Sequence, residues 1–423
     1  MAEKVGVGVY VLLVGLLIGL AHQRRSSRGW VLHVALASLS AGVALGVVEV
    51  VLSTYPALLP DSVLVHNPYL LLRARGIRPD HVQDVLEHLA ESPYVKFKPN
   101  VNVRSMGYRG DDFTAEWTTD ELGFKNEPRI AAMRKVTAIA LGDSFVEAMG
   151  VAPAKQWSTL VSNAGFPVYS VGVQGYAPTQ MVGVLRKYGP LFRSEFVLFG
   201  FTPVFEERSL RFSDATKIVA TLRYEGGIEL INQYLREIRN VEYRILPVTN
   251  ALLSTARTEI GAIARNGISG SLRGRKDSLS RYRDGVAQSA AVPFDATSIG
   301  WTQTLDAILE AKDVSRRLGA RLVVLLFSQR SFSYYEKIMG AAAPEGHYEA
   351  RLARTLDEFC RANGILVIDT HRDFQEYVST VWPSVRELPF FDIDGHPNEI
   401  GQRLIAKRVI RLFETHPVHR VGT

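Results

Sequence analysis

A serine, a histidine and two aspartates stand in sequence contexts that suit nucleophilic catalysis. Ser144 follows the apolar run 136–141 after a glycine and an aspartate, and the glycine allows a tight turn that exposes the serine at the end of a strand. His396 lies near the C-terminus, shortly after Asp392 and Asp394. A hydroxyl, an imidazole and a carboxylate together can form an acyl-serine intermediate, with the imidazole as general base and the carboxylate as its orienting partner.

These side chains must be positioned by a sheet whose strands are short and almost entirely apolar. From residue 135 onward apolar runs alternate with helical patterns, and the runs predict strands at 136–142, 167–173, 195–202, 321–327 and 365–369. Strands that are apolar throughout are buried on both faces, which is typical of a parallel sheet. The sequence therefore predicts an α/β fold, a three-layer α/β/α sandwich around a five-stranded parallel sheet. Ligands bind beyond the carboxyl ends of such strands, where Ser144 and Gly172 are expected.

The pattern divides the chain into three parts. Residues 1–55 predict a transmembrane helical hairpin, and 56–134 mix proline, glycine and charge, which we interpret as a juxtamembrane collar with a short helix around 80–91. We expect residues 135–423 to form the domain that carries Ser144 and His396. At about 206–300 the alternation stops for longer than ordinary connections in compact domains allow, so we interpret this segment as an inserted lid or subdomain.

Two apolar stretches near the N-terminus approach the length that crosses a bilayer. Residues 5–21 carry no charge, and 30–55 are apolar apart from His33 and Glu49, whereas a membrane helix needs about 20 apolar residues. The short connection is rich in arginine, and such connections stay in the cytoplasm. We therefore predict a two-pass protein of the cell membrane with its large domain on the extracytoplasmic side, periplasmic or extracellular. A signal peptide cleaved after Ala21 is the competing interpretation.

Composition excludes several other classes of protein. The net charge is +6 and no long block of basic residues occurs, so nucleic acid is not an expected partner. The single cysteine, Cys360, lies on a predicted helix and leaves no intrachain disulfide possible. The histidines show no spacing typical of metal ligands, and we expect neither a metal nor another cofactor.

Four segments of the chain resemble the signature blocks of the SGNH, or GDSL-like, hydrolases. Gly-Asp-Ser-Phe at 142–145 resembles the first block, and Asp-Gly-His-Pro-Asn at 394–398 resembles the last. Between them, residues 170–176 resemble the second block. Residues 119–124 resemble the lead-in that membrane-anchored bacterial members carry before the first strand. The resemblance covers roughly residues 95–415.

This resemblance implies the SGNH fold, which is flavodoxin-like, and a role for each matching residue. Ser144 is implied to be the nucleophile and His396 the base. Asp394 is implied to orient the imidazole, with Asp392 as the alternative acid. The oxyanion hole is implied to consist of the backbone amides of Ser144 and Gly172. An acyl-serine would then pass its acyl group to water or to a sugar hydroxyl.

The sequence differs from the family's pattern in two places. The third block normally supplies an asparagine to the oxyanion hole, but Phe205 and Glu206 stand where Asn-Asp is expected, and the loss of one donor can cost about 10²–10³ in rate. The commonest pattern also places the acid three residues before the histidine, where this chain has Ile393. Asp394 is two residues before His396, a spacing that resembles the polysaccharide O-acetylation branch.

Three functions follow from these expectations. The first is an esterase that removes O-acyl groups, in particular acetyl, from extracytoplasmic carbohydrate or small esters. The second is an O-acyltransferase component that works beside a membrane-bound O-acyltransferase partner; the membrane spans and the Asp-x-His spacing favour it. The third is a catalytically weakened binding or scaffold subunit, which the phenylalanine at 205 favours. The same residues serve hydrolysis and transfer, so the sequence does not choose between them.

Overall fold

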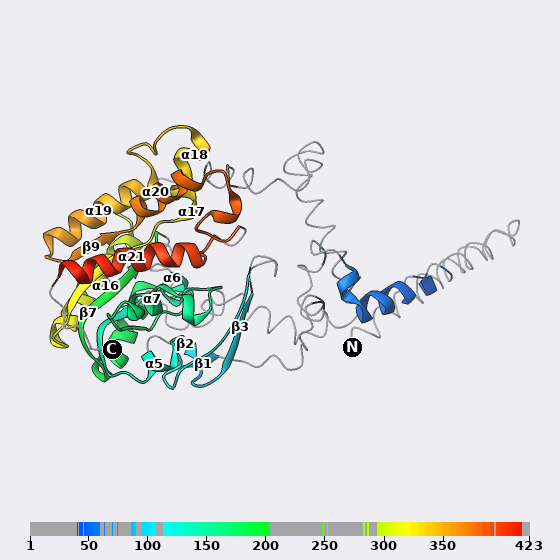
Figure 1. The fold of residues 1–423 in the computed structure, drawn as a ribbon, viewed down its shortest axis with the longest axis horizontal. Coiled ribbons are helices and arrows are strands. Elements are labelled where there is room, and N and C mark those ends of the chain that lie inside the picture. The colour runs from blue at the N-terminus through cyan, green and yellow to red at the C-terminus, as the bar shows by residue number, and fades with distance from the viewer. Residues whose placement is uncertain are drawn as a thin grey trace, which may run out of the picture. The chain divides into compact units, whose positions relative to one another are not determined.

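The computed structural model describes most of the chain from residue 95 onward and shorter pieces before it. The described residues are 46–59, 86–89, 95–106, 113–203, 294–392 and 395–416, with further positions at 40, 42–44, 63, 70, 74, 248, 252, 282–283 and 286. The chain divides into two compact units. One comprises Met1–Asp84 with Ile231–Gly274, and the other comprises Val85–Leu230 with Arg275–Thr423 (Figure 1).

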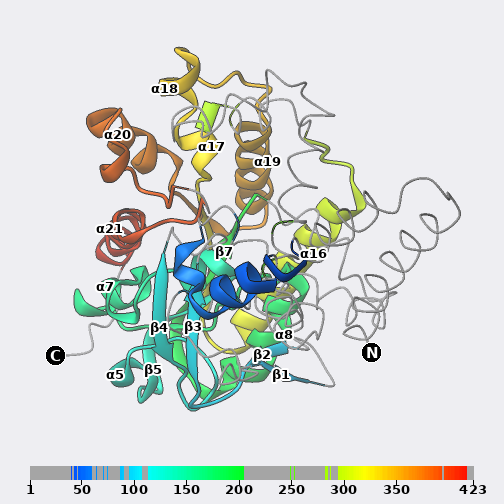
Figure 2. The same ribbon diagram turned by 90° about the vertical axis from the view of Figure 1, so that its right-hand side faces the viewer.

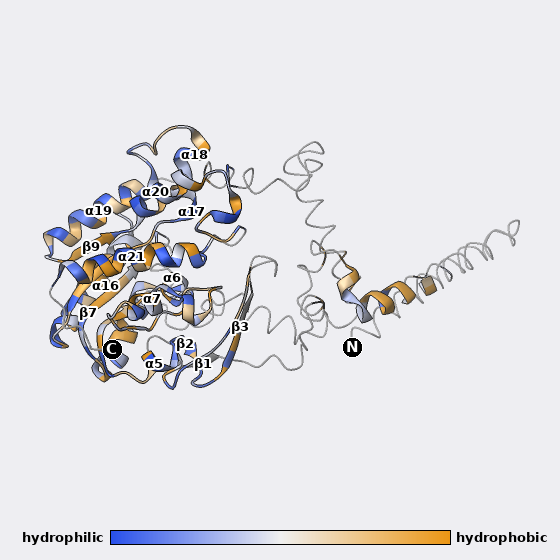
Figure 3. Cartoon of the chain, in the orientation of Figure 1, coloured by the Kyte–Doolittle hydropathy of each residue, from blue (hydrophilic) through white to orange (hydrophobic). Residues whose placement is uncertain are grey.

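The described part of the first unit is helical and apolar. Residues 46–54 form a helix that is followed by the 3-10 turn η1 (Pro56–Leu58), and the carboxylate of Glu49 accepts a 2.8 Å hydrogen bond from the backbone amide of Val248. A small core of this unit consists of Leu59, Val63, Leu70 and Val248. Val50 is 65% exposed, and Figure 3 colours the helix before Pro56 as mainly hydrophobic.

The described residues include no helix with the length and apolar character that a bilayer crossing requires. The predicted span at 5–21 lies outside the described residues, and the predicted span at 30–55 is described mainly in its second half. The membrane hairpin therefore stays a prediction.

The second unit contains the predicted five-stranded parallel sheet. Its strands lie in the order β6-β5-β7-β8-β9, all in parallel register. Their bounds are β5 (Lys135–Leu141), β6 (Val168–Ser170), β7 (Arg193–Phe201), β8 (Arg321–Leu326) and β9 (Leu366–Asp369). The prediction of a five-stranded parallel sheet is confirmed, although the edge strand β9 is only partly buried. The strand predicted at 167–173 already ends at Ser170, whereas those predicted at 136–142, 195–202 and 321–327 end one residue before the predicted bound. Val171 and Val173 still donate hydrogen bonds to the carbonyls of Ala140 and Gly142.

Helices cover both faces of the sheet. They are α5 (Pro128–Ala131), α6 (Ser144–Glu147), α7 (Trp157–Asn163), α8 (Pro178–Tyr188), α16 (Ile299–Arg317), α17 (Arg330–Ser333), α18 (Tyr335–Met339), α19 (Tyr348–Ala362), α20 (His371–Val381) and α21 (Glu399–Thr415). The short 3-10 turns are η3 (Pro153–Lys155), η4 (Gly189–Leu191) and η6 (Val385–Glu387). Cys360 is buried on α19, as a free thiol on the helix that the sequence predicts.

The alternation of side chains along each strand explains the three layers. Ala138, Phe196 and Val323 belong to one buried cluster with residues of α7, α20 and α21. The neighbouring side chains of each strand point to the opposite face, where α8 and α16 pack on each other and on β5 and β8. Figure 2 shows α7 and α21 on one side of the sheet and α8 and α16 on the other. The predicted three-layer sandwich is therefore present.

Two antiparallel hairpins precede the sheet, and one of them corrects a prediction. Residues 86–88, expected within a helix around 80–91, form β1 (Leu86–His88), which pairs with β2 (Val95–Phe97). Glu87 stands directly opposite Lys96, and their side chains form a 2.7 Å ion pair, so pairing with a second strand overrides the local pattern. The second hairpin consists of β3 (Asn102–Met106) and β4 (Thr114–Thr118).

The segment after β4 is attached to the sheet through the carboxylate of Asp120. This carboxylate accepts hydrogen bonds from the backbone amide of Phe124, from Asn126 Nδ2 and from the hydroxyl of Tyr169 on β6. Asn126 in turn donates to the carbonyl of Ser170 and accepts from its amide, each at 2.9 Å. The lead-in motif at 119–124 thus fixes the end of β6, from which the loop with Gly172 begins.

The predicted insertion at about 206–300 lies largely outside the described residues. Phe205 and Glu206, the residues at the expected asparagine block, lie outside them as well. The chain is described continuously again from Phe294, and α16 begins at Ile299.

Candidate active site

The nucleophile turn connects β5 to α6 at the carboxyl end of the sheet. Ser144 is the first residue of α6, and its side chain is almost fully buried. A Cβ atom on Gly142 would lie only 2.1 Å from Cγ2 of Val146, so only glycine fits beside this short helix. The strand, the glycine and the helix therefore place the serine where the sequence predicts a nucleophile.

Asp143 holds the turn in this conformation. Its carboxylate caps α6 by accepting a 3.0 Å hydrogen bond from the amide of Phe145. The same carboxylate accepts a 2.9 Å hydrogen bond from the hydroxyl of Thr202, which follows β7. Asp143 is therefore a structural residue that ties the nucleophile turn to the central strand of the sheet.

The structure brings His396 to Ser144 across 252 residues of sequence. His396 Nε2 lies 2.7 Å from Ser144 Oγ, and the imidazole packs against the ring of Phe145 at 5.1 Å between centroids. This is the distance at which a base removes a hydroxyl proton. The two residues that the sequence assigns as nucleophile and base thus meet as predicted.

Asn398 fixes the loop that carries the histidine. Its side-chain oxygen accepts hydrogen bonds from the first turn of α21, and its Nδ2 donates to the carbonyls of Leu388 and Phe390. The carbonyl of His396 also accepts a 2.9 Å hydrogen bond from the amide of Phe391. The loop is therefore closed on itself immediately before the helix begins.

Of the two candidate acids of the predicted triad, the structure describes Asp392 and not Asp394. Asp394 and Ile393 lie outside the described residues, so the orienting role of Asp394 stays a prediction. Asp392, the alternative acid, has a carboxylate that accepts a hydrogen bond from the hydroxyl of Tyr282. Tyr282 could not be predicted, because it lies in the inserted segment, far along the chain from both motif blocks.

Gly172 lies in the loop after β6, packed against the nucleophile helix. A Cβ atom at this position would lie 2.6 Å from the backbone nitrogen of Glu147 and 2.8 Å from Cβ of Val146. Among the described groups, none accepts a hydrogen bond from the amide of Ser144 or of Gly172. These two amides are the donors that the sequence assigns to the oxyanion hole, and close packing holds their two segments together.

Two buried groups next to the site, a carboxyl and an amine, were not predicted from the sequence. Glu147 is 2% exposed, and its carboxylate accepts a 2.6 Å hydrogen bond from the amide of Gln174, two residues beyond Gly172. Lys125 donates to the backbone carbonyls of Ala148 and Val151 at 2.8 and 2.6 Å. Burial raises the pKa of Glu147 to about 7 against the opposing effect of Lys125, and burial lowers the pKa of Lys125 to about 8. The position of Glu147 one helical turn after the nucleophile was the only available signal.

The arrangement suits acyl transfer through a serine. It combines a hydroxyl at a strand end, an imidazole in hydrogen-bonding range and two amides in adjoining segments. Over the described ranges, no group of histidine, cysteine, aspartate and glutamate side chains is arranged to hold a metal ion.

The comparison with solved structures finds similar proteins at low sequence identity. An acetyl xylan esterase is 12% identical, with a TM-score of 0.35, over 66% of this chain and 99% of the esterase. A lipase/acylhydrolase from Enterococcus faecalis is 13% identical, with a TM-score of 0.32, over 67% of this chain and 96% of its own. A two-domain esterase active on acetylated mannans is 12% identical, with a TM-score of 0.30, over 68% of this chain and 50% of its own. No protein-family model and no curated protein sequence matches the chain.

Proposed function

We propose that this protein is a membrane-anchored serine esterase of the SGNH type that hydrolyses O-acyl esters, in particular acetyl esters, of cell-surface carbohydrate. One observation carries the proposal: His396 Nε2 lies 2.7 Å from Ser144 Oγ at the carboxyl end of a parallel sheet. The motif resemblance at 142–145 and 394–398 supports the same reaction class.

The geometry supports a two-step reaction. Ser144 Oγ attacks the ester carbonyl carbon while His396 Nε2 takes the hydroxyl proton, and the amides of Ser144 and Gly172 stabilise the oxyanion. Collapse of the tetrahedral intermediate breaks the ester bond, the departing alcohol takes the proton from the imidazolium, and the acyl group stays on Ser144. Water then attacks the acyl-serine with the same base, which releases the carboxylic acid and restores both side chains.

In this mechanism the two backbone amides carry most of the oxyanion stabilisation. Among the described residues, Thr202 carries the polar side chain nearest to the missing asparagine block along the chain, and its hydroxyl donates to Asp143. Phe205 stands where the family's asparagine is expected. We therefore propose a modest turnover rate, because each absent oxyanion donor costs about 10²–10³ in rate.

The proposed location follows from the two apolar stretches near the N-terminus. Residues 5–21 and 30–55, with arginines between them, support two membrane spans and an extracytoplasmic catalytic domain. An anchored enzyme on that side meets acylated carbohydrate of the cell surface. A cysteine introduced at residue 270 and labelled with an impermeant reagent in intact cells tests this topology. Protection of that cysteine in intact cells, with labelling only after lysis, contradicts the proposed orientation.

A second function, O-acyl transfer, is favoured by one observation. Asp394 stands two residues before His396, the spacing that resembles the polysaccharide O-acetylation branch. In that case a sugar hydroxyl replaces water in the second step, and a membrane-bound O-acyltransferase is the proposed partner. Mass spectrometry of a glycan acceptor incubated with the protein and an acyl donor distinguishes the two reactions, because only transfer adds an acyl group to the acceptor.

The esterase proposal is tested with the full chain in detergent. Wild type should hydrolyse p-nitrophenyl acetate, and a fluorophosphonate probe should label Ser144 covalently, as located by peptide mass spectrometry. Ser144→Ala and His396→Ala should abolish both signals. Ser379→Ala, which alters an exposed serine on α20, should change neither. Equal hydrolysis by wild type and Ser144→Ala would remove the catalytic assignment and favour a binding or scaffold role.

A further inference from the structure

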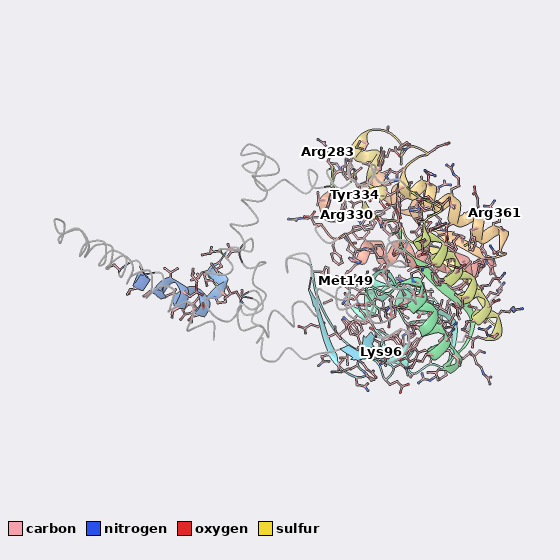
Figure 4. The ribbon with its side chains drawn as sticks, turned by 180° about the vertical axis from the view of Figure 1, so that it is seen from behind. Lys96, Met149, Arg283, Arg330, Tyr334 and Arg361 are labelled. Atoms are coloured by element: carbon pink, nitrogen blue, oxygen red, sulfur yellow. The ribbon has the colours of Figure 1, made fainter. Side chains whose placement is uncertain are left out.

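The guanidinium group of Arg330 connects the end of β8 with the loop that leads to His396. Arg330 begins α17, and its Nη1 donates hydrogen bonds to the carbonyls of Phe391 and Asp392 at 2.9 and 2.7 Å. Figure 4 shows Arg330 close to Tyr334 and far from Arg361 on α19. One cationic side chain thus binds two consecutive carbonyls of the segment just before the catalytic histidine.

Tyr282 holds the same segment from another side. Its ring lies 5.0 Å from the Arg330 guanidinium carbon, and its hydroxyl donates to the carboxylate of Asp392. Tyr282 is buried and packs edge-to-face on Tyr334. Asp392 is therefore held through its backbone carbonyl and its side chain at once.

The guanidinium also lies against Gly395, directly before the histidine. A Cβ atom at Gly395 would lie 3.4 Å from the guanidinium carbon of Arg330, and Gly395 has a left-handed φ of +85°. Arg330 thus contacts the loop at Phe391 and at Gly395. The amide of Phe391 also donates a hydrogen bond to the carbonyl of His396, which joins these two parts of the loop. A displaced guanidinium would remove its two hydrogen bonds to this loop and its contact with Gly395, and Asn398 would be left to hold the loop.

Arg330 itself is anchored by a buried ion pair. The residues on either side of it, Gln329 and Ser331, both donate to the carboxylate of Glu349 at 3.3 Å. Glu349 lies 3.2 Å from Nε2 of His371, and both side chains are buried. The backbone from which the Arg330 side chain extends is therefore attached to the core through its two neighbours, and the guanidinium itself is held by the two carbonyls and the ring of Tyr282.

We propose that Arg330 is a positioning residue that holds the His396 imidazole in line with Ser144 for proton transfer. This inference rests on the proposed esterase function. A lysine cannot replace it fully, because an ammonium lacks the planar guanidinium that lies over the ring of Tyr282 while its Nη1 donates to both carbonyls. Loss of Arg330 should therefore slow the chemical step while substrate binding stays nearly the same.

The test uses Arg330→Ala and Arg330→Lys in the full chain, with Arg361→Ala as the matched control. Arg361 pairs with Asp357 on its own helix, on the far side of the fold from Arg330. We expect kcat for p-nitrophenyl acetate, and the rate of fluorophosphonate labelling, to fall together by about 10–100-fold in Arg330→Ala, because a misplacement of about 1 Å can cost 10²-fold. KM should change little, and Arg330→Lys should lie between Arg330→Ala and wild type.

Rescue separates positioning from a merely structural role. Guanidinium ion added at millimolar concentration should restore part of the lost kcat to Arg330→Ala and nothing to Ser144→Ala. An unchanged kcat in Arg330→Ala would overturn the inference, and so would a loss of activity that follows the folded fraction and shows no rescue. If Arg330→Ala does not fold, Arg330→Lys decides: a lower kcat with little change in KM supports the inference, and an unchanged kcat overturns it. A wild type that neither hydrolyses the ester nor reacts with the probe would instead overturn the proposed function.

Discussion

The carboxylate of Glu147 accepts a 2.6 Å hydrogen bond from the backbone amide of Gln174, and this bond joins the nucleophile helix to the loop that carries Gly172. Glu147 lies on the same short helix as Ser144, one turn later. The two proposed oxyanion donors therefore belong to segments that a single buried side chain connects. The distance between those donors depends on this connection, because stabilisation of an oxyanion requires both amides to point at one atom.

Replacement of Glu147 by alanine should destabilise the fold and slow catalysis. The variant leaves the buried amide of Gln174 without its acceptor, which costs about 1–3 kcal/mol. Glu147→Gln retains an oxygen that can accept this hydrogen bond, so its loss should be smaller. Urea unfolding and kcat measure the two effects. Glu358→Ala, at an exposed site on α19, serves as the control. Full stability in Glu147→Ala would show that the loop does not depend on the hydrogen bond to Gln174.

Much of the fold could be predicted because buried parallel strands carry an unmistakable local pattern. The runs at 136–141 and 322–326 need no distant partner to be recognised, since every side chain in them is buried. Ser144 and His396 could be predicted for a similar reason. Each stands in a short motif whose residues, Gly142 and Asn398 among them, shape the local turn.

The remaining parts of the site depend on contacts between distant residues that follow no spacing rule. Lys125 and Glu147 are buried charges from different segments, and a sequence alone presents such residues as solvated surface. Arg330 finds its acceptors in a loop near the C-terminus, with Tyr282 beneath it. The prediction of a helix around 80–91 was wrong because β1 is stabilised by β2, a partner strand that lies beyond the segment from which the helix was predicted.

Alanine at Gly172 should move an oxyanion donor out of position without unfolding the protein. The new Cβ would lie 2.6 Å from the backbone nitrogen of Glu147. Because both contacting atoms belong to rigid positions of the chain, the clash can be relieved only if the loop that carries Gly172 moves. We expect kcat to fall by about 10²–10³, the loss typical of one missing oxyanion donor, with KM little changed. Steady-state kinetics and circular dichroism provide the measurement. Gly346→Ala is the matched control, because nothing lies within 4 Å of its Cβ position. Wild-type kcat in Gly172→Ala would argue against an oxyanion role.

Removal of the Thr202 hydroxyl should loosen the nucleophile turn. Thr202→Val keeps the shape of the side chain but loses the 2.9 Å hydrogen bond to Asp143, which should lower the free energy of unfolding by about 1–2 kcal/mol. We expect a smaller kcat as well, because Asp143 caps the helix that begins with Ser144. A double-mutant cycle with Asp143→Ala measures the coupling, and additive losses would contradict the link. Thr302→Val, on an exposed part of α16, is the control.

His371 should make stability fall at alkaline pH. Burial alone would lower the pKa of its imidazole, but hydrogen bonds to Asp369 and Glu349 outweigh burial and raise the pKa from 6.5 to about 9. The folded state therefore favours the protonated form. This contribution is fully present below pH 6.5 and is lost as the pH rises through about 9. A shift of this size corresponds to at most about 3 kcal/mol.

The free energy of unfolding, compared between pH 6.5 and pH 9 in wild type and His371→Gln, measures this contribution. The comparison with the variant is necessary because Glu147 and Lys125 have pKa values of about 7 and 8 and titrate in the same range. We expect a steeper alkaline loss in wild type, whereas His416→Gln, at the end of α21, should follow wild type. Equal slopes in wild type and His371→Gln would mean that His371 is neutral in the folded protein. The carboxylate of Glu349 would then lack its cation, and the anchor beneath Arg330 would depend on the hydrogen bonds from Gln329 and Ser331 alone.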